Sequence, residues 1–152
     1  MKTRIYSINL SKIKGVSKTP VDYVRVIEDF GFEDDVHAGD IVKQVSLLSI
    51  ESIKKQNECI EIKGASGYLK PGDFAENITT EGIDLCDLKI GQKFKIGNDV
   101  VLEITKIGKD CHRHCSIYYK IGGCIMPKEG IFAKVLKGGV IRKNDTIEEI
   151  AC

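Results

Sequence analysis

The chain has no tryptophan, only three prolines, almost no net charge and no long apolar run. A membrane-spanning helix needs about 20 apolar residues, and Met1 to Ile5 lack the apolar stretch of a signal peptide. Twenty-three basic residues nearly cancel twenty-two acidic ones, for a net charge of +1, so no sustained basic face for duplex nucleic acid is indicated. We therefore expect a cytoplasmic protein that binds neither membrane nor nucleic acid.

The length and the cysteine content limit the number of domains and the class of protein. A chain of 152 residues, 42% hydrophobic and 30% charged, is typical of a single globular domain, which we place over residues 1–152. Six cysteines are too few for a small domain held together by disulfides. In a reducing cytosol they are thiols, and we interpret Cys59, Cys86 and Cys152 as buried packing groups.

Short segments with glycine turns dominate the pattern. Alternation of apolar and polar residues predicts strands, listed here by range: 4–10, 44–50, 92–96, 100–107, 131–136 and 141–150. Residues 97–99 predict a hairpin turn, and Gly138–Gly139 predicts a second turn. Residues 21–30 are ambiguous, and we expect them to be extended.

Helices are predicted to be minor. Residues 49–58 predict a short surface helix, with Ser49 as its capping residue. This pattern favours a mostly β fold, a barrel or sandwich with a few short helices.

The segment richest in reactive side chains is residues 108–115, which follows directly on a predicted strand. Cys111 stands beside His112, with Lys109 and Arg113 close in sequence. Nearby positive charge lowers a thiol pKa, so we interpret Cys111 as a thiolate that attacks sulfur or carbon, carries a persulfide or ligates a soft metal. Together with Cys115 and His114 the segment also offers four zinc ligands, although ligands so close in sequence fit a structural zinc site poorly.

Two further loops hold candidate residues. Cys124 lies in the glycine-flanked loop 122–130, which suits anion binding, and Cys124 is a candidate resolving thiol there; a loop that needs glycine only for its turn is the alternative. In 31–40, His37 is a candidate proton donor whose tautomer Asp35 or Asp40 would fix. Composition alone favours a plain acidic surface loop for this segment.

Residues 71–82 form a predicted turn that leads into a strand. Asn77 and its polar neighbours there are candidates for ligand contact, or else bond their own backbone in turns.

These clusters, in this order, resemble the MOSC domain family, named after the C-terminal domain of molybdenum cofactor sulfurase. The resemblance rests on segments 31–39, 71–85, 88–97 and 126–141 and on the strand leading to Cys111. It covers nearly the whole chain and is nearest to the small stand-alone bacterial members. It departs where Asp34 replaces a common glycine, and where Cys115 and Cys124 add to the single family cysteine.

The resemblance implies a MOSC-type β-barrel and sulfur or molybdenum chemistry centred on Cys111, as a sulfur carrier or as the thiolate ligand of molybdenum in the pterin cofactor. The expected catalytic residues are Cys111, Cys115, Cys124 and His37. The expected ligand-binding residues are Lys109, His112, Arg113, His114, Asp35, Asn77 and Lys128.

Three functions stay open at this point. The first is sulfur transfer or molybdenum cofactor ligation by the Cys111 thiolate, with the molybdenum-pterin cofactor as the one cofactor considered. The second is a carbon–sulfur lyase or reductase acting on a small sulfur compound. The third is a non-catalytic carrier that hands molybdopterin to a partner, either a molybdoenzyme or a sulfurtransferase.

Overall fold

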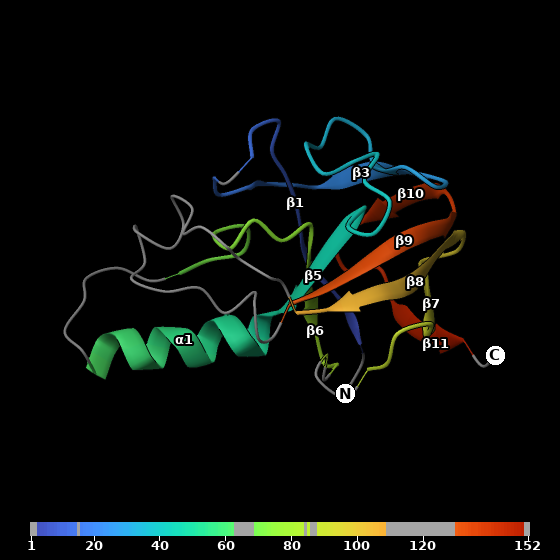
Figure 1. Cartoon of the computed structure of the whole chain (residues 1–152). Coiled ribbons are helices and arrows are strands. Elements are labelled where there is room, and N and C mark those ends of the chain that lie inside the picture. The colour runs from blue at the N-terminus through green and yellow to red at the C-terminus, as the bar shows by residue number, and fades with distance from the viewer. Residues whose placement is uncertain are drawn as a thin grey trace.

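The described residues form a large curved sheet joined to a small one, with the helix α1 at one end (Figure 1). The computed structural model describes residues 3–14, 16–62, 69–83, 85, 88–108 and 130–150, with the backbone alone for 58–62. The elements are β1 (Arg4–Leu10), β2 (Thr19–Val21), β3 (Tyr23–Ile27), β4 (Gly31–Phe32), β5 (Val45–Ser49), α1 (Ile50–Ile62), β6 (Ile78–Glu81), β7 (Lys93–Ile96), β8 (Val100–Ile107), β9 (Ile131–Lys137), β10 (Gly139–Arg142) and β11 (Ile147–Ile150).

The large sheet has eight strands in the order β11-β7-β8-β9-β5-β6-β1-β2, and the small sheet has the order β10-β3-β4. All neighbouring strands run antiparallel except β5 and β6, which are parallel. A parallel pair needs a crossover connection, and α1 lies in the connection between these two strands. Strand β1, the first in the sequence, pairs with β6, which comes about seventy residues later.

The large sheet curls until its two ends approach each other. The amide of Ile5 donates to the Asp145 carbonyl (2.9 Å), and the amide of Ile147 donates to the Thr3 carbonyl (3.0 Å). Arg4 and Thr146 form an isolated bridge and not a ladder. The mostly β class is thus confirmed, whereas the described strands do not close into the predicted barrel.

Most predicted strands are confirmed. Strands β1 and β8 have the predicted bounds, and β5, β7 and β9 lie within a residue or two of theirs. The turn at residues 97–99 joins β7 to β8 as predicted. The ambiguous segment 21–30 is extended and contains β3.

The predicted turn at Gly138–Gly139 is wrong, and so is the single strand over 141–150. Strand β9 belongs to the large sheet and β10 to the small one, so Gly138 marks a crossing from one sheet to the other. A Cβ at Gly138 would lie 2.6 Å from the Val26 carbonyl oxygen. Glycine is needed here because the backbone of β3 passes too close for a side chain.

Helix α1 begins as predicted and runs four residues further. Ser49 caps it, since its Oγ accepts from the Ser52 amide at 3.0 Å. Leu48, Ile50 and Ile53 of this region pack with Phe74 and Phe132 in a small cluster apart from the main core. Within the described ranges, no helix has the length and apolar character that crossing a membrane requires.

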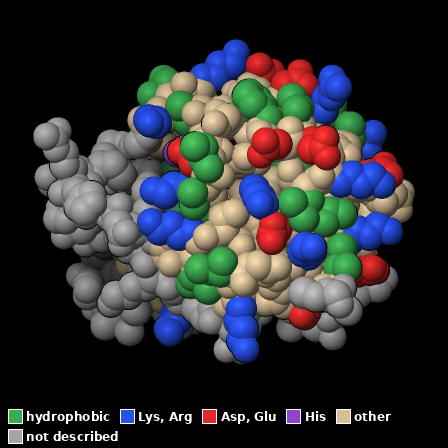
Figure 2. Space-filling view, turned by 45° about the vertical axis from the view of Figure 1, so that its right-hand side comes forward, with side chains coloured by type: hydrophobic (Ala, Val, Ile, Leu, Met, Phe, Trp, Pro, Cys, Tyr) green, Lys and Arg blue, Asp and Glu red, His purple; other side chains and the backbone are tan. Residues whose placement is uncertain are grey.

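The main core fills the interior of the curled sheet. Fully buried members from distant strands include Ile5, Ile8, Ile78, Val100 and Ile141. Basic and acidic side chains are interspersed over the face shown in Figure 2, as the near-zero net charge predicts. This rigid interior holds the strand ends on which the polar site described below is built.

Candidate functional site

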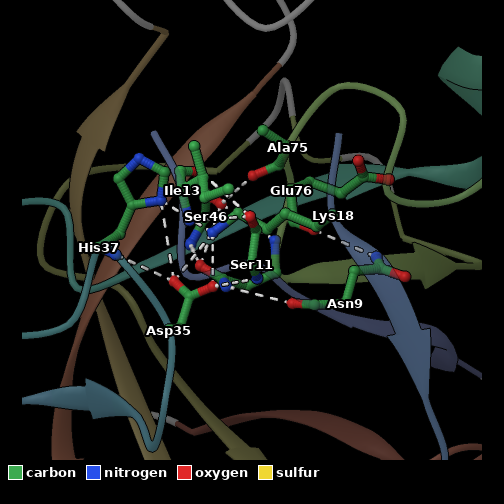
Figure 3. Close-up of polar contacts among 10 residues, drawn as sticks. Asn9, Ser11, Ile13, Lys18, Asp35, His37, Ser46, Ala75 and Glu76 are labelled. Atoms are coloured by element: carbon green, nitrogen blue, oxygen red, sulfur yellow. Dashed lines mark hydrogen bonds and ion pairs between the residues drawn. The ribbon is translucent and has the colours of Figure 1, made fainter. Parts of the chain in front are cut away.

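A buried ion pair lies where several strands of the large sheet begin or end (Figure 3). Lys18 Nζ lies 2.8 Å from each carboxylate oxygen of Asp35. The side chains are 1% and 0% exposed. Buried lysine and aspartate are rare unless they are paired, so each side chain allows the burial of the other.

His37 completes the cluster. Its Nδ1 lies 2.8 Å from Lys18 Nζ and 3.8 Å from the nearer Asp35 oxygen. The ring is 22% exposed, so it forms the outer member of the group. The lysine, and not the carboxylate, is the direct partner of this ring nitrogen.

The Asp35 carboxylate is held on all sides by donors. Besides Lys18, it accepts from the backbone amides of Ser11 (3.0 Å) and His37 (3.1 Å). Burial acts to raise the pKa of Asp35, but the hydrogen bonds and the charge of Lys18, with help from Ser11 and Asn77, outweigh it and hold the pKa below its usual value. Asp35 is therefore a carboxylate at neutral pH.

Lys18 reaches the cluster because its backbone is clamped before β2. Its amide donates to the Gly72 carbonyl at 2.7 Å. Gly72 has φ +89°, and a Cβ there would overlap the Lys18 carbonyl oxygen. Only glycine allows both the left-handed conformation and this close approach, so the predicted 71–82 turn positions a residue more than fifty positions away.

The loop after β4 places Asp35 and His37. The Val36 amide donates to the Ser11 carbonyl at 2.7 Å, which joins this loop to the end of β1. Asp34, the position at which the sequence departs from the resemblance, has φ +66° and is left-handed. Aspartate is among the few side chains that tolerate this region.

Asn77 lies fully buried and joins three strands. Its Oδ1 accepts from the Ser46 amide (3.0 Å), and its Nδ2 donates to the Asn9 carbonyl (3.3 Å). This geometry favours a structural role for Asn77, beside its effect on Asp35, over the direct ligand contact that its residue type suggested.

Glu76 is a second buried carboxyl group near the cluster, and it has no cationic partner among the described residues. Its Oε2 accepts from the Gly72 amide (3.1 Å) and the Thr79 hydroxyl (2.7 Å), whereas Oε1 lacks a hydrogen-bond partner in the described part of the chain. Burial raises the pKa of Glu76 to about 7, because these hydrogen bonds offset the lost hydration only in part.

The strands that flank the cysteine-rich segment meet at the same level of the sheet. The Gly108 amide donates to the Gly130 carbonyl at 2.7 Å. Ile131 and Ile78 pair with Leu47 from opposite sides, two strand spacings or about 10 Å apart. The start of β9 therefore lies about that far from the start of β6, which Asn77 directly precedes, and the end of β8 lies one strand spacing further away.

Several predicted site residues lie outside the described residues: Lys109, Cys111, His112, Arg113, His114, Cys115, Cys124 and Lys128. The zinc alternative for this segment lies outside them as well, as do Cys86, Cys152 and the side chain of Cys59. Within the described ranges, no group of three or more His, Cys, Asp or Glu side chains could hold a metal ion.

The segment 31–40 had two interpretations, a plain acidic surface loop and a functional loop around His37, and each fits part of it. Asp40 is a surface residue whose Oδ1 accepts from the amides of Val42 and Lys43, both at 2.8 Å. Asp35, by contrast, is not part of a plain surface loop, because it is buried against Lys18. Sequence reasoning missed Lys18 altogether, since it lies in a short polar stretch with no periodicity and lysine is ordinarily exposed.

Comparison with known families supports the sequence resemblance. Residues 33–148, well over half of the chain, match the model of a family described as the MOSC domain. This range includes Asp35, His37, Glu76 and Cys111. No curated protein gives a significant sequence match.

Solved structures share the fold. The YuaD protein from Bacillus subtilis matches with a TM-score of 0.78 and 18% identity, over 98% of this chain and 96% of its own. YiiM from Geobacillus stearothermophilus matches with a TM-score of 0.73 and 23% identity, over 98% and 75%. YiiM from Escherichia coli matches with a TM-score of 0.69 and 15% identity, over 100% and 71%.

Proposed function

The chain belongs to the MOSC domain family, and on this premise we propose that it carries sulfane sulfur on the thiolate of Cys111. The family is linked to molybdenum cofactor and sulfur metabolism. The observation that carries the proposal is the family match over residues 33–148, which spans the cysteine-histidine segment. Lys109, His112 and Arg113 supply the positive charge that keeps a thiol ionised near neutral pH.

The proposed transfer needs no external oxidant. The Cys111 thiolate attacks the terminal sulfur of a small persulfide, the S–S bond of the donor breaks, and the donor leaves as a thiolate. Cys111 then holds the sulfur as a persulfide. Attack of the Cys115 or Cys124 thiolate on the Cys111 sulfur releases hydrosulfide and forms a disulfide, so the two cysteines are oxidised as the sulfane sulfur is reduced.

The family match covers both His37 and Cys111, and His37 is the partly exposed, outer member of the buried cluster. We propose that His37 faces the same site and supplies a hydrogen bond or proton to the reacting sulfur.

The molybdenum-pterin cofactor is the second occupant that the family suggests. The donor set fits it in part, because Cys111 offers a soft thiolate and His37 an N–H donor. When bound, the cofactor would supply redox chemistry at its metal. Cys111 would hold the metal through sulfur, and His37 would orient an oxygen or sulfur atom beside it.

Mass spectrometry of the intact protein tests the proposal. After incubation with a low-molecular-weight persulfide and removal of the excess, we expect a gain of one sulfur atom that maps to Cys111. Cys111→Ser should lose this gain, and Cys59→Ser should keep it.

An equal gain in Cys111→Ser would contradict the proposal, and so would an unmodified protein that shows neither the sulfur gain nor a disulfide to Cys111. Molybdenum bound in stoichiometric amount to protein from a molybdate-fed host, together with no persulfide, would assign Cys111 to the cofactor instead.

A further inference from the structure

Lys18 can act only as a hydrogen-bond donor toward His37. An ammonium group carries three N–H bonds and no acceptor. Within the described residues it contacts both Asp35 oxygens at 2.8 Å and His37 Nδ1 at 2.8 Å. The doubly bonded, buried carboxylate of Asp35 keeps the lysine charged. His37 Nδ1 must therefore accept.

We propose that the buried Lys18–Asp35 pair fixes His37 as a neutral imidazole with its proton on Nε2. An imidazole that accepts at one nitrogen carries its proton on the other. His37 thus presents an N–H donor, and the ligand atom that meets Nε2 must be an acceptor, such as an anionic sulfur or oxygen atom. This deepens the proposed function and rests on it for the identity of the ligand.

The same contact prevents His37 from becoming an imidazolium. A proton on Nδ1 would point at the Lys18 ammonium from 2.8 Å, and two positive charges would then share one buried site. Asp35 cannot offset both, because its oxygens are already shared among Lys18, the Ser11 amide and the His37 amide. Asp40 also acts on the ring within the described residues, and it is exposed with its Oδ1 bound to the backbone.

Lys18 is therefore a positioning residue and not a catalytic one. It acts on the ligand through His37, and Asp35 acts through Lys18. A plain loop histidine would change charge near its ordinary pKa of about 6.5, and it would then offer two donors below that pH and one above it. The buried pair removes this change over the range where the protein works.

Asp35 and Lys18 hold both the backbone and the ring of His37. The Asp35 carboxylate receives the His37 backbone amide at 3.1 Å, so the aspartate orients the backbone of the residue whose ring the lysine fixes. Asp35 and Lys18 come from separate loops, which the Val36–Ser11 and Lys18–Gly72 backbone bonds hold in place. The ring is thus set from both its backbone and its Nδ1 side.

Nitrogen-15 NMR of histidine-labelled protein tests the inference directly, with His37→Gln used to assign the signals. In the unmodified protein we expect His37 to show a protonated Nε2 and an unprotonated Nδ1, with no change between about pH 5.5 and pH 8. In the double variant Lys18→Met/Asp35→Asn, Nδ1 loses its donor, so protonation of His37 Nδ1 should appear as the pH falls, at a higher pH than in the unmodified protein. The double variant removes both charges together, so it leaves no unpaired buried ion.

The matched control is Lys12→Met/Asp34→Asn, which makes the same changes at exposed positions of the same two loops; its His37 signals should match those of the unmodified protein. The inference is overturned if His37 in the unmodified protein is protonated on Nδ1 or gains charge near pH 6.5, or if the double variant leaves its signals unchanged. These readouts do not depend on sulfur loading. A fixed tautomer without a Cys111 persulfide rejects the proposed function alone, and a titrating His37 with a Cys111 persulfide rejects this inference alone.

Discussion

Asp35 and Glu76 are both buried at the same end of the sheet, yet they hold their protons differently. The pKa of Asp35 lies below its usual value, because Lys18 and two backbone amides outweigh the effect of burial. The pKa of Glu76 is raised to about 7, because burial outweighs the hydrogen bonds from the Thr79 hydroxyl and from backbone amides. Burial alone therefore does not decide the charge of a carboxyl group; the partners that the fold brings to it do.

The two groups differ in what they can contribute. Asp35 is fixed as an anion and serves to hold Lys18 and His37. Glu76 can gain or lose a proton near neutral pH, and its Oε1 has no partner among the described residues. The first is a rigid electrostatic element, and the second carries a free-energy cost whenever it ionises.

The largest effect is expected when Asp35 loses the cation Lys18 and becomes, like Glu76, a buried carboxyl group without a cationic partner. Lys18→Met leaves a buried carboxylate unpaired and should lower the free energy of unfolding by about 3–5 kcal/mol. Urea unfolding at pH 7 measures this. Adding Asp35→Asn to Lys18→Met should recover most of the loss, and Lys12→Met, at an exposed position, should change little. A cost below about 1 kcal/mol for Lys18→Met would show that the pair is not formed.

The pH dependence of stability tests Glu76. The unfolded chain releases this proton near pH 4.5, whereas the folded protein keeps it to about pH 7. Between these values the folded state binds more protons, so the free energy of unfolding falls as pH rises, by about 3 kcal/mol in total. Glu76→Gln should remove this fall, which unfolding curves from pH 4.5 to pH 8 would reveal.

Glu149→Gln, on the exposed side of β11, is the control for Glu76→Gln and should keep the pH dependence. The contribution of Asp35 has the opposite sign, since its depressed pKa stabilises the fold above pH 3.8 and the gain is lost as pH falls through the lower folded value. If Glu76→Gln follows the unmodified protein at every pH, Glu76 does not titrate between pH 4.5 and pH 8.

A smaller effect should come from Thr79, which donates to Glu76 Oε2 at 2.7 Å. Thr79→Val should cost about 1–2 kcal/mol, with a larger cost at pH 8 than at pH 5 because the ionised carboxylate needs the donor more. Thr80→Val is the matched control, since the Thr80 hydroxyl is buried without a hydrogen-bond partner in the described part of the chain. Equal costs for the two variants would contradict the assigned role of Thr79.

The strands were predictable because their signal is local. Alternation of side chains along β1 and β8 reports directly which face is buried, and both strands have their predicted bounds. Gly138 was misjudged for a reason that is not local. Its glycine is required by the passing backbone of β3, which the sequence alone does not place.

The site was predictable only in part for the same reason. His37 and Asp35 stand two residues apart, so their cooperation can be seen in the sequence. Lys18 is one of twenty-three basic residues, and nothing in its neighbours distinguishes it from the exposed Lys12 and Lys14. A buried aspartate that stays ionised needs charge compensation, but the clamp between Lys18 and Gly72 determines which cation Asp35 receives.

The hydrogen bond between Gly108 and Gly130 has a consequence for how such proteins diversify. The chain leaves β8 and re-enters β9 at adjacent points, so the residues between them connect two neighbouring antiparallel strands. The free energy of closing a connection grows only slowly with its length, so the insert can be exchanged while the strand register stays fixed. One framework, with its buried lysine and partly exposed histidine, is thereby suited to different sets of thiols in this connection.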